Sequence, residues 1–276
     1  MVELFRIGHF SIYLFGVAVA LGIIVGMFIM SIESKRKGLD SDKIFDLALY
    51  TILASIIGAR IYYVVAFDLS YYIQNPSEIF LISSGGMSIQ GGLIGGTLFA
   101  LWYTKKKNIS FFEAADVAAP AIAIGQAIGR IGCDVFGIPM KNVYPWGINV
   151  AGQILHPAQM YEMYLNLILF IFLWSRRGKI RYNGELFIKY IIGFSINRAL
   201  VEIFRTNPLV VGPLSIAHVT SIIIIILALI VNKKIKNNNM IVESNVECSR
   251  VKVPMYQYIL VALIAILGTW FYYYIH

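Results

Sequence analysis

Arginine and acidic residues interrupt several apolar stretches of this sequence, and their side-chain types could do chemistry. Arg130 is followed four residues later by Asp134 in the run GRIGCDVFGIPMK. Arg198, Glu202 and Arg205 are spaced i, i+4 and i+7, which places them on one face of a helix. Guanidinium groups bind phosphates in a bidentate geometry, so these residues indicate an anion site.

Polar residues of other apolar stretches are predicted to complete this site. They are Arg60, Gln90, His156, Gln159, Tyr161 and Glu162. Because a charged group inside a membrane costs roughly 3 kcal/mol, several at one depth indicate a functional cavity. Structural roles remain open for single residues: Arg198 and Glu202 could pair within their own helix, and Arg205 could extend to the membrane interface.

The elements that must position these residues are predicted to be transmembrane helices. Of the 276 residues, 58% are hydrophobic and 14% are charged, a balance outside that of soluble domains. Windows without Asp, Glu, Lys or Arg that exceed the roughly 20 residues of a spanning helix are 7–32, 79–104, 206–232 and 253–276. Further apolar stretches with isolated charges cover about 44–66, 111–136, 157–175 and 184–204. We predict an all-α integral membrane protein with a seven-helix transmembrane core and one appended C-terminal transmembrane helix.

The basic residues predict the orientation in the membrane. They follow the first, third, fifth and seventh spans, at residues 35–43, 105–107, 176–181 and 233–236. By the positive-inside rule the N-terminus lies outside, and eight spans place the C-terminus outside as well. The candidate residues then share the outer halves of their spans, with Gln90 near the middle of the third. The net charge of +8 belongs to these loops, so no nucleic-acid partner is predicted.

The predicted domains are a seven-span membrane domain at 1–232, a polar basic linker at 233–253 and an additional transmembrane helix at 254–276, which we expect to be an anchor. The glycine spacing of GGMSIQGGLIGG predicts close helix packing; the alternative is a broken segment with Gln90 directed into a cavity. Residues 137–156 are expected to be irregular. The four histidines have no metal-ligand spacing, so no metal or other cofactor is predicted.

In their order and spacing, the motifs GGMSIQGGLIGG, GRIGCDVFG, HPAQMYE and RALVEIFR resemble those of the bacterial phosphatidylglycerol–prolipoprotein diacylglyceryl transferases. The resemblance covers about residues 5–232. It implies an enzyme of lipoprotein biosynthesis in the bacterial cytoplasmic membrane. This family moves the diacylglyceryl group of phosphatidylglycerol to the lipobox cysteine of a prolipoprotein at the outer face, and glycerol phosphate leaves.

The resemblance also implies roles for the residues. Arg130 and Arg198 match essential arginines and are expected to hold the lipid phosphate, and Glu202 is expected to orient an arginine. Gln90 and Asp134 complete the predicted catalytic set. The predicted substrate-binding residues are Arg60, Arg130, His156, Gln159, Tyr161, Glu162, Arg205 and the signature glycines Gly129, Gly132 and Gly137.

The sequence departs from the family pattern within these motifs. Gln90 replaces the usual histidine, so a histidine base is unavailable there. Phe15 replaces a tyrosine, and the signature has Cys133, Asp134, Phe136 and Ile138 in place of asparagine, phenylalanine, asparagine and glutamate. Asp134 either partners a nearby arginine or lysine or replaces the lost carboxylate.

Cys133 has two interpretations, a small buried filler or a reactive thiol beside Arg130 that carries the diacylglyceryl group transiently. Two other functions also remain open for the whole protein. One is a paralogue that acts on another phospholipid or acceptor. The other is a non-enzymatic lipid or anion binder or transporter.

Overall fold

The computed structural model of the chain describes residues 2–8, 10–81, 85–212, 214–238 and 254–276. The chain forms two compact units. The first unit comprises residues 1–29 and 115–276, and the second unit comprises residues 30–114. Helix α1 (Leu14–Arg36) begins in the first unit and ends in the second.

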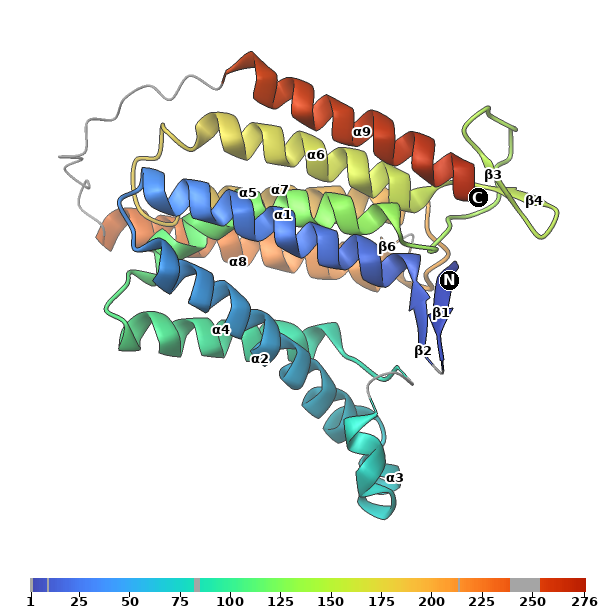
Figure 1. Cartoon of the computed structure of the whole chain (residues 1–276), viewed down its shortest axis with the longest axis horizontal. Coiled ribbons are helices and arrows are strands. Elements are labelled where there is room, and N and C mark those ends of the chain that lie inside the picture. Colours follow the sequence, from blue (N-terminus) through green and yellow to red (C-terminus); the bar gives the residue numbers. More distant parts are fainter. Residues whose placement is uncertain (1, 9, 82–84, 213, 239–253) are drawn as a thin grey trace. The chain divides into compact units, whose positions relative to one another are not determined.

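Helices and three short hairpins build the first unit. After the start of α1, its helices are α5 (Phe111–Ile131), α6 (Ala158–Arg176), α7 (Glu185–Glu202), α8 (Ile216–Asn238) and α9 (Met255–Ile275). The antiparallel hairpins are β1 (Glu3–Ile7) with β2 (Phe10–Tyr13), β3 (Ile148–Val150) with β4 (Gln153–Leu155), and β5 (Leu209–Val211) with β6 (Leu214–Ser215). Strands β3, β4 and β6 lie at the end of this unit where α5, α7 and α9 finish and α6 and α8 begin (Figure 1).

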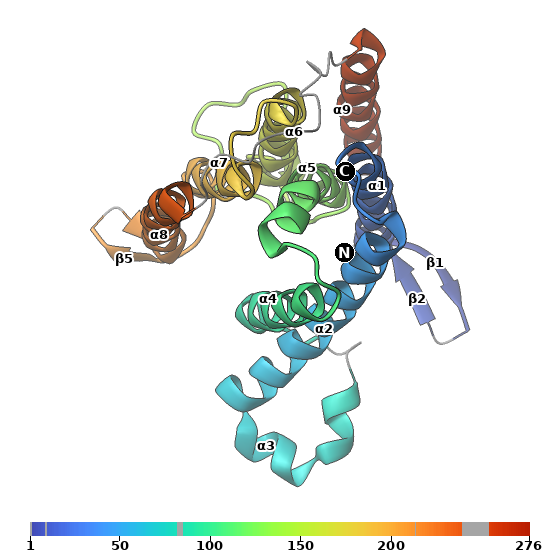
Figure 2. The same ribbon diagram turned by 90° about the vertical axis from the view of Figure 1, so that its left-hand side faces the viewer.

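Helix α5 lies in the middle of the first unit (Figure 2). In its most apolar window 61% of the residues are buried, against 11% for α8 and 17% for α9. Small side chains allow this central position, since Ala119, Ala123 and Ala127 are fully buried. A Cβ atom added to Gly22 of α1 would lie 2.5 Å from the carbonyl oxygen of Gly125, so the backbones of α1 and α5 are in contact.

The first turn of α7 is fastened to α5. The side chain of Asp116 accepts hydrogen bonds from the backbone N–H groups of Gly184 and Phe187, both at 2.9 Å. An acidic side chain that binds free N–H groups stabilises a helix N-terminus. Nearby, the buried carboxylate of Glu185 pairs with Lys189 at 2.8 Å. Two carboxylates, those of Asp116 and Glu185, therefore hold the N-terminal end of α7 in place.

Helix α9 packs along α6. Trp174 Nε1 donates to Gln257 Oε1 at 2.7 Å near one end, and the hydroxyls of Tyr164 and Thr269 are 2.5 Å apart near the other. The residues before α9, 239–253, lie outside the described residues, and so does most of the predicted linker.

The second unit contains α2 (Ser41–Phe67), α3 (Leu69–Gln74), the 3₁₀ helix η1 (Pro76–Phe80) and α4 (Ile89–Lys106). Its main contact joins α2 to α4. A Cβ atom on Gly58 would lie 2.6 Å from the carbonyl oxygen of Gly91 and 3.0 Å from the Cα atom of Gly95. The close helix packing predicted from the glycine spacing is confirmed.

Five helices among the described residues are long and apolar enough to cross a membrane: α1, α2, α5, α8 and α9. The prediction of a mostly helical, multi-pass membrane protein is therefore supported. The remaining long helices, α4, α6 and α7, fall outside this set. The count of seven spans plus one thus stays a prediction.

Four predicted boundaries or loops were wrong. Residues 10–13 of the first window form β2, and residues 209–211 and 214–215 of another window form β5 and β6. In the window 79–104, η1 ends at Phe80 and α4 begins only at Ile89, and Gly85 and Gly86 between them have φ of 89° and 75°, which interrupt a helix. The loop 137–156, expected to be irregular, contains β3 and β4. A stretch without charged residues indicates an apolar environment, but it does not distinguish a helix from a hairpin.

Candidate functional site at the helix ends of the first unit

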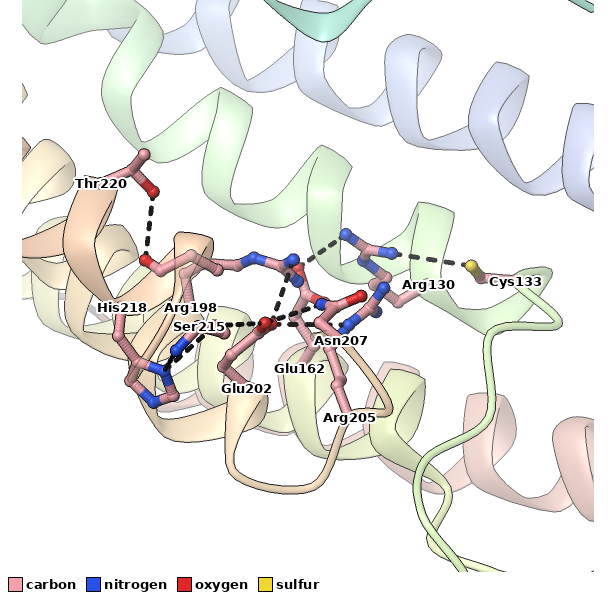
Figure 3. A network of polar contacts seen from close by, with 11 residues as sticks. Arg130, Cys133, Glu162, Arg198, Glu202, Arg205, Asn207, Ser215, His218 and Thr220 are labelled. Carbon is pink, nitrogen blue, oxygen red and sulfur yellow. Dashed lines mark hydrogen bonds and ion pairs between the residues drawn. The ribbon is translucent and has the colours of Figure 1, made fainter. Parts of the chain in front are cut away.

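A polar cluster joins the ends of α5, α6 and α7 with the residues before α8 (Figure 3). Arg130 lies in the last turn of α5, and Glu162 lies at the second turn of α6. Arg198 and Glu202 lie at the end of α7, with Arg205 just beyond it. Three helices therefore bring five of the predicted site residues together.

Arg130 and Glu162 form the connection between α5 and α6. Arg130 Nη2 lies 2.7 Å from Glu162 Oε1, and the Glu162 side chain is 2% exposed. A buried ion pair of this kind is strengthened by the low local dielectric. The second oxygen of Glu162 has no hydrogen-bond partner among the described residues.

Glu202 is the centre of the second half of the cluster. Its Oε2 atom lies 3.3 Å from Arg198 Nη2 and 3.6 Å from Arg205 Nε. Its Oε1 atom accepts hydrogen bonds from Asn207 Nδ2 and Ser215 Oγ, both at 2.7 Å. Because the carboxylate is held from the other side, it fixes the orientation of both arginines.

The two halves form one electrostatic site. Burial and the neighbouring charges of Arg198 and Arg130 lower the pKa of the Arg205 guanidinium, and the carboxylates of Glu202 and Glu162 oppose this shift. Three guanidinium groups face two carboxylates, which leaves an excess of positive charge. The side chains of Arg130, Arg198 and Arg205 are 30%, 27% and 17% exposed, so an anion can reach them. The pairing of Arg198 with Glu202 within one helix is present and leaves the arginine accessible.

An apolar cavity and an aromatic group adjoin the charged cluster. The cavity has a volume of about 310 Å³ and is lined by Tyr161, Tyr164, Leu165, Leu200, Val201 and Phe204. The hydroxyl of Tyr161 accepts a hydrogen bond from Trp146 Nε1 at 3.0 Å and lies 3.1 Å from His156 Nδ1. The predicted residues His156 and Tyr161 are therefore close to the cavity, beside the charged cluster.

The residues that follow α5 have several partners. Cys133 is buried, and Arg130 Nη1 lies 3.6 Å from its sulfur. Asp134 Oδ1 lies 3.0 Å from His276 Nε2, and Asp134 Oδ2 accepts from the backbone N–H of Val2 at 3.1 Å. Burial raises the pKa of the Asp134 carboxyl, but its hydrogen bonds and the positive charges near it, among them those of His276, together outweigh burial, so this pKa lies below its usual value.

The signature glycines shape the backbone of the site. A Cβ atom on Gly132 would lie 2.7 Å from the Leu14 carbonyl oxygen, and one on Gly137 would collide with the Phe204 carbonyl oxygen and lie 3.0 Å from that of His156. Gly137 also donates to that carbonyl at 2.8 Å. The site of Gly129 is looser, since its nearest contact would be 3.8 Å away. Their predicted contact with substrate stays a prediction.

Gln159 points toward α9. Its side chain is 2% exposed, and its amide donates a hydrogen bond to the hydroxyl of Tyr272. Sequence reasoning missed Tyr272 and His276, because an aromatic helix end is typical of a membrane anchor. It also missed Asn207 and Ser215, whose neutral side chains give no signal by spacing.

Arg60 and Gln90 belong to the second unit and are described there. Arg60 is buried, and its guanidinium donates to the carbonyls of Glu78, Ile79, Leu81, Gly85 and Gly86. This arginine therefore holds the segment that precedes α4. Gln90 lies in the first turn of α4, not near the middle of a span as predicted, and accepts a hydrogen bond from Ser88 Oγ at 2.6 Å.

A helical membrane protein with an arginine–glutamate cluster at one end of its helices is the class that this fold and site define. Residues 2–232 match the family model described as prolipoprotein diacylglyceryl transferase. The chain therefore belongs to this family, and the resemblance read from the motifs is confirmed.

Two relatives show the extent of the similarity. The phosphatidylglycerol–prolipoprotein diacylglyceryl transferase of Clostridioides difficile (strain 630) is 40% identical over 240 residues, which are 85% of this chain and 96% of the relative. The protein of the same name from Bacillus cereus (strain G9842) is 36% identical over 239 residues, 82% of this chain and 88% of the relative. The family match ends at residue 232, before α9.

Proposed function

We propose that this protein transfers the diacylglyceryl group of phosphatidylglycerol to the lipobox cysteine of prolipoproteins, as the names of its relatives imply. The observation that carries the proposal is the convergence of Arg130, Arg198 and Arg205 on two buried carboxylates. An accessible cluster with excess positive charge suits an anionic lipid head group.

Arg130 and Arg198 bind the phosphodiester, and Glu162 and Glu202 keep them oriented. In the reaction, the acceptor thiol loses its proton and its sulfur attacks the glyceryl carbon. The sulfur–carbon bond forms, the carbon–oxygen bond to phosphate breaks, and glycerol phosphate leaves with the electron pair and takes up the proton that the thiol lost. The arginines stabilise the charge that develops on the phosphate. Their positive field also favours the thiolate over the thiol.

The apolar part of the lipid needs a site next to its phosphate. The cavity between α6 and α7 has apolar and aromatic walls and adjoins the charged cluster. In this proposal it accommodates part of an acyl chain. Tyr161, held by Trp146 and close to His156, separates the polar half of the site from the apolar half.

The membrane arrangement in this proposal follows the sequence. Residues 1–232 cross the bacterial cytoplasmic membrane seven times, and α9 crosses it once more after a polar linker. Both termini lie outside, because the basic residues after alternate spans lie inside. The arginine cluster then faces the outer leaflet, where phosphatidylglycerol and the exported prolipoprotein meet.

The proposal is tested with purified protein in micelles that contain phosphatidylglycerol and a lipobox peptide. Mass spectrometry is expected to detect a thioether-linked diacylglyceryl peptide. Arg130→Ala should abolish this product. Arg176→Ala is the matched control, because this exposed arginine stacks on Phe172 at the opposite end of α6. Its product yield should equal that of the wild type.

Absence of product from the wild-type protein would reject the proposal. If a lipid other than phosphatidylglycerol copurifies and the peptide stays unmodified, the protein is a paralogue with another substrate. If lipid binds or moves without any covalent product, it is a binder or transporter.

A further inference from the structure

The C-terminal helix α9 contacts both segments that carry the Arg130–Glu162 pair. One is the stretch that follows Arg130 at the end of α5. The other is the beginning of α6. Helix α9 lies beyond residues 2–232, the part of the chain that the family model matches.

The contact with the end of α5 is made by His276. Its Nε2 atom lies 3.0 Å from Asp134 Oδ1, and its ring packs edge-on against Phe136 with 5.5 Å between ring centres. Earlier in α9, a Cβ atom on Gly268 would lie 2.8 Å from Ile131 Cδ1. The helix thus packs closely against the end of α5.

The two ring nitrogens of His276 both face hydrogen-bond acceptors, and we call the contact between His276 and Asp134 the clamp. Its Nδ1 atom lies 3.0 Å from the backbone oxygen of Tyr272, and its Nε2 atom faces the carboxylate of Asp134. Both partners accept hydrogen bonds, so both ring nitrogens donate only when the imidazole is protonated. The ring is 8% exposed. A charge-assisted hydrogen bond in this setting is stronger than a neutral one.

The contact with the beginning of α6 is made by Tyr272. This side chain is fully buried, and its hydroxyl accepts a hydrogen bond from the amide of Gln159. Gln159 precedes Glu162 by three residues in α6, so the two lie on neighbouring parts of one helix face. Next to it in α9, the Tyr273 hydroxyl donates a hydrogen bond to the backbone oxygen of Trp146, just before β3, at 2.7 Å.

We propose that α9 is a positioning element for the transferase site, and that His276 and Tyr272 are its positioning residues. His276 holds Asp134, four residues after Arg130, while Tyr272 holds Gln159, three residues before Glu162. One rigid helix therefore sets the separation of the two segments that the Arg130–Glu162 ion pair connects. This inference rests on the proposed function.

The sequence offers a second reason for this assignment. Asp134 and Phe136 are two of the positions at which the signature departs from the pattern described above. Both contact His276. The segment that follows Arg130 therefore contacts the end of α9 through two of its side chains.

The test separates positioning from general stability by kinetics. His276→Ala and Tyr272→Phe should each lower kcat about tenfold, since small displacements of a binding group slow a reaction strongly. The KM for phosphatidylglycerol should change less than about twofold, because the arginines themselves remain. Tyr274→Phe is the matched control, because Tyr274 lies on the same helix and is 76% exposed. The kcat of this variant should stay at the wild-type value.

A double-mutant cycle tests whether the clamp acts as one unit. Asp134→Ala should lower kcat as His276→Ala does, and the double variant should be no slower than either single variant. Independent, additive losses would overturn the clamp. If His276→Ala does not fold, Tyr272→Phe still decides the question, because it removes a single hydroxyl.

Thiol labelling gives a readout that does not depend on activity. In a Cys248→Ser background, buried Cys133 should react slowly with a maleimide. His276→Ala should accelerate this labelling, whereas Tyr274→Phe should not. Unchanged labelling together with an unchanged kcat would overturn the role of α9. A wild-type protein without transferase activity would instead reject the proposed function.

Discussion

Replacing Glu162 with glutamine separates charge from shape at the contact with Arg130. Glutamine is nearly isosteric and keeps an oxygen that can accept from Arg130 Nη2, at present 2.7 Å from Glu162 Oε1. Only the negative charge is removed. Arg130 keeps its own charge and loses the partner that fixes its direction.

The expected loss follows from the strength of the two kinds of hydrogen bond. A bond to a charged group contributes about 1.5–3 kcal/mol and a neutral one about 0.5–1.5 kcal/mol, so the difference is about 1–1.5 kcal/mol. Arg130 is 30% exposed, and solvent screening reduces the gain from its charge partner. We therefore expect the lower end of this free-energy difference, about 1 kcal/mol, which corresponds to about a fivefold decrease in kcat.

The assay is steady-state transfer to a lipobox peptide at several concentrations of phosphatidylglycerol. If Glu162 orients Arg130 for the developing charge, kcat falls and KM does not rise. The matched control is Glu185→Gln. Glu185 is equally buried and pairs with Lys189 at 2.8 Å, but it lies at the other end of α7. This variant should lose thermal stability and keep its kcat.

A raised KM with an unchanged kcat in Glu162→Gln would refute the reasoning, because Glu162 would then act on lipid binding alone. An equal decrease of kcat in the Glu185 control would refute it as well. In that case any buried ion pair of the first unit would support activity through stability.

Three further outcomes are expected. Gly137→Ala should lower thermal stability by about 1–3 kcal/mol, because the added methyl would collide with the backbone carbonyl oxygen of Phe204; Gly129→Ala, with a nearest contact of 3.8 Å, should not. The lowered pKa of Asp134 means that its ionised form stabilises the fold above about pH 4 and that this contribution is lost as the pH falls through the folded-state pKa. Asp134→Asn should flatten thermal stability against pH in that range. Arg60→Lys should make the segment before α4 more sensitive to limited proteolysis, since three lysine donors cannot replace five bonds to carbonyls.

The charged half of the site could be predicted because ionisable residues are rare in apolar stretches and stand out. The spacing of Arg198 and Glu202 predicted their pairing on one helix face, whereas Arg205 lies beyond the end of α7 and reaches Glu202 from the turn that follows. The partner of Arg130 could not be read from spacing, since Glu162 lies 32 residues away on another helix. That contact depends on how α5 and α6 pack.

The helix starts were less predictable, because hairpins at a membrane boundary are as apolar as helices. The residues of β2, β5 and β6 carry no charge, yet they form strands. The role of α9 was hidden for a related reason. Its tyrosines fit an interfacial anchor equally well, and the bond between Gln159 and Tyr272 joins residues 113 apart in sequence.

The capping of α7 by Asp116 has a consequence for how the site could open. Asp116 ties the first turn of α7 to α5, and Arg130 lies 14 residues further along α5, about 20 Å from this tie. Glu202 lies at the far end of α7, at a comparable distance. A small change in the angle between α5 and α7 at the Asp116 tie would therefore displace their other ends, which carry Arg130 and Glu202, the most. The Asp116 tie therefore leaves the site end of the two helices freer to change its spacing than the tied end.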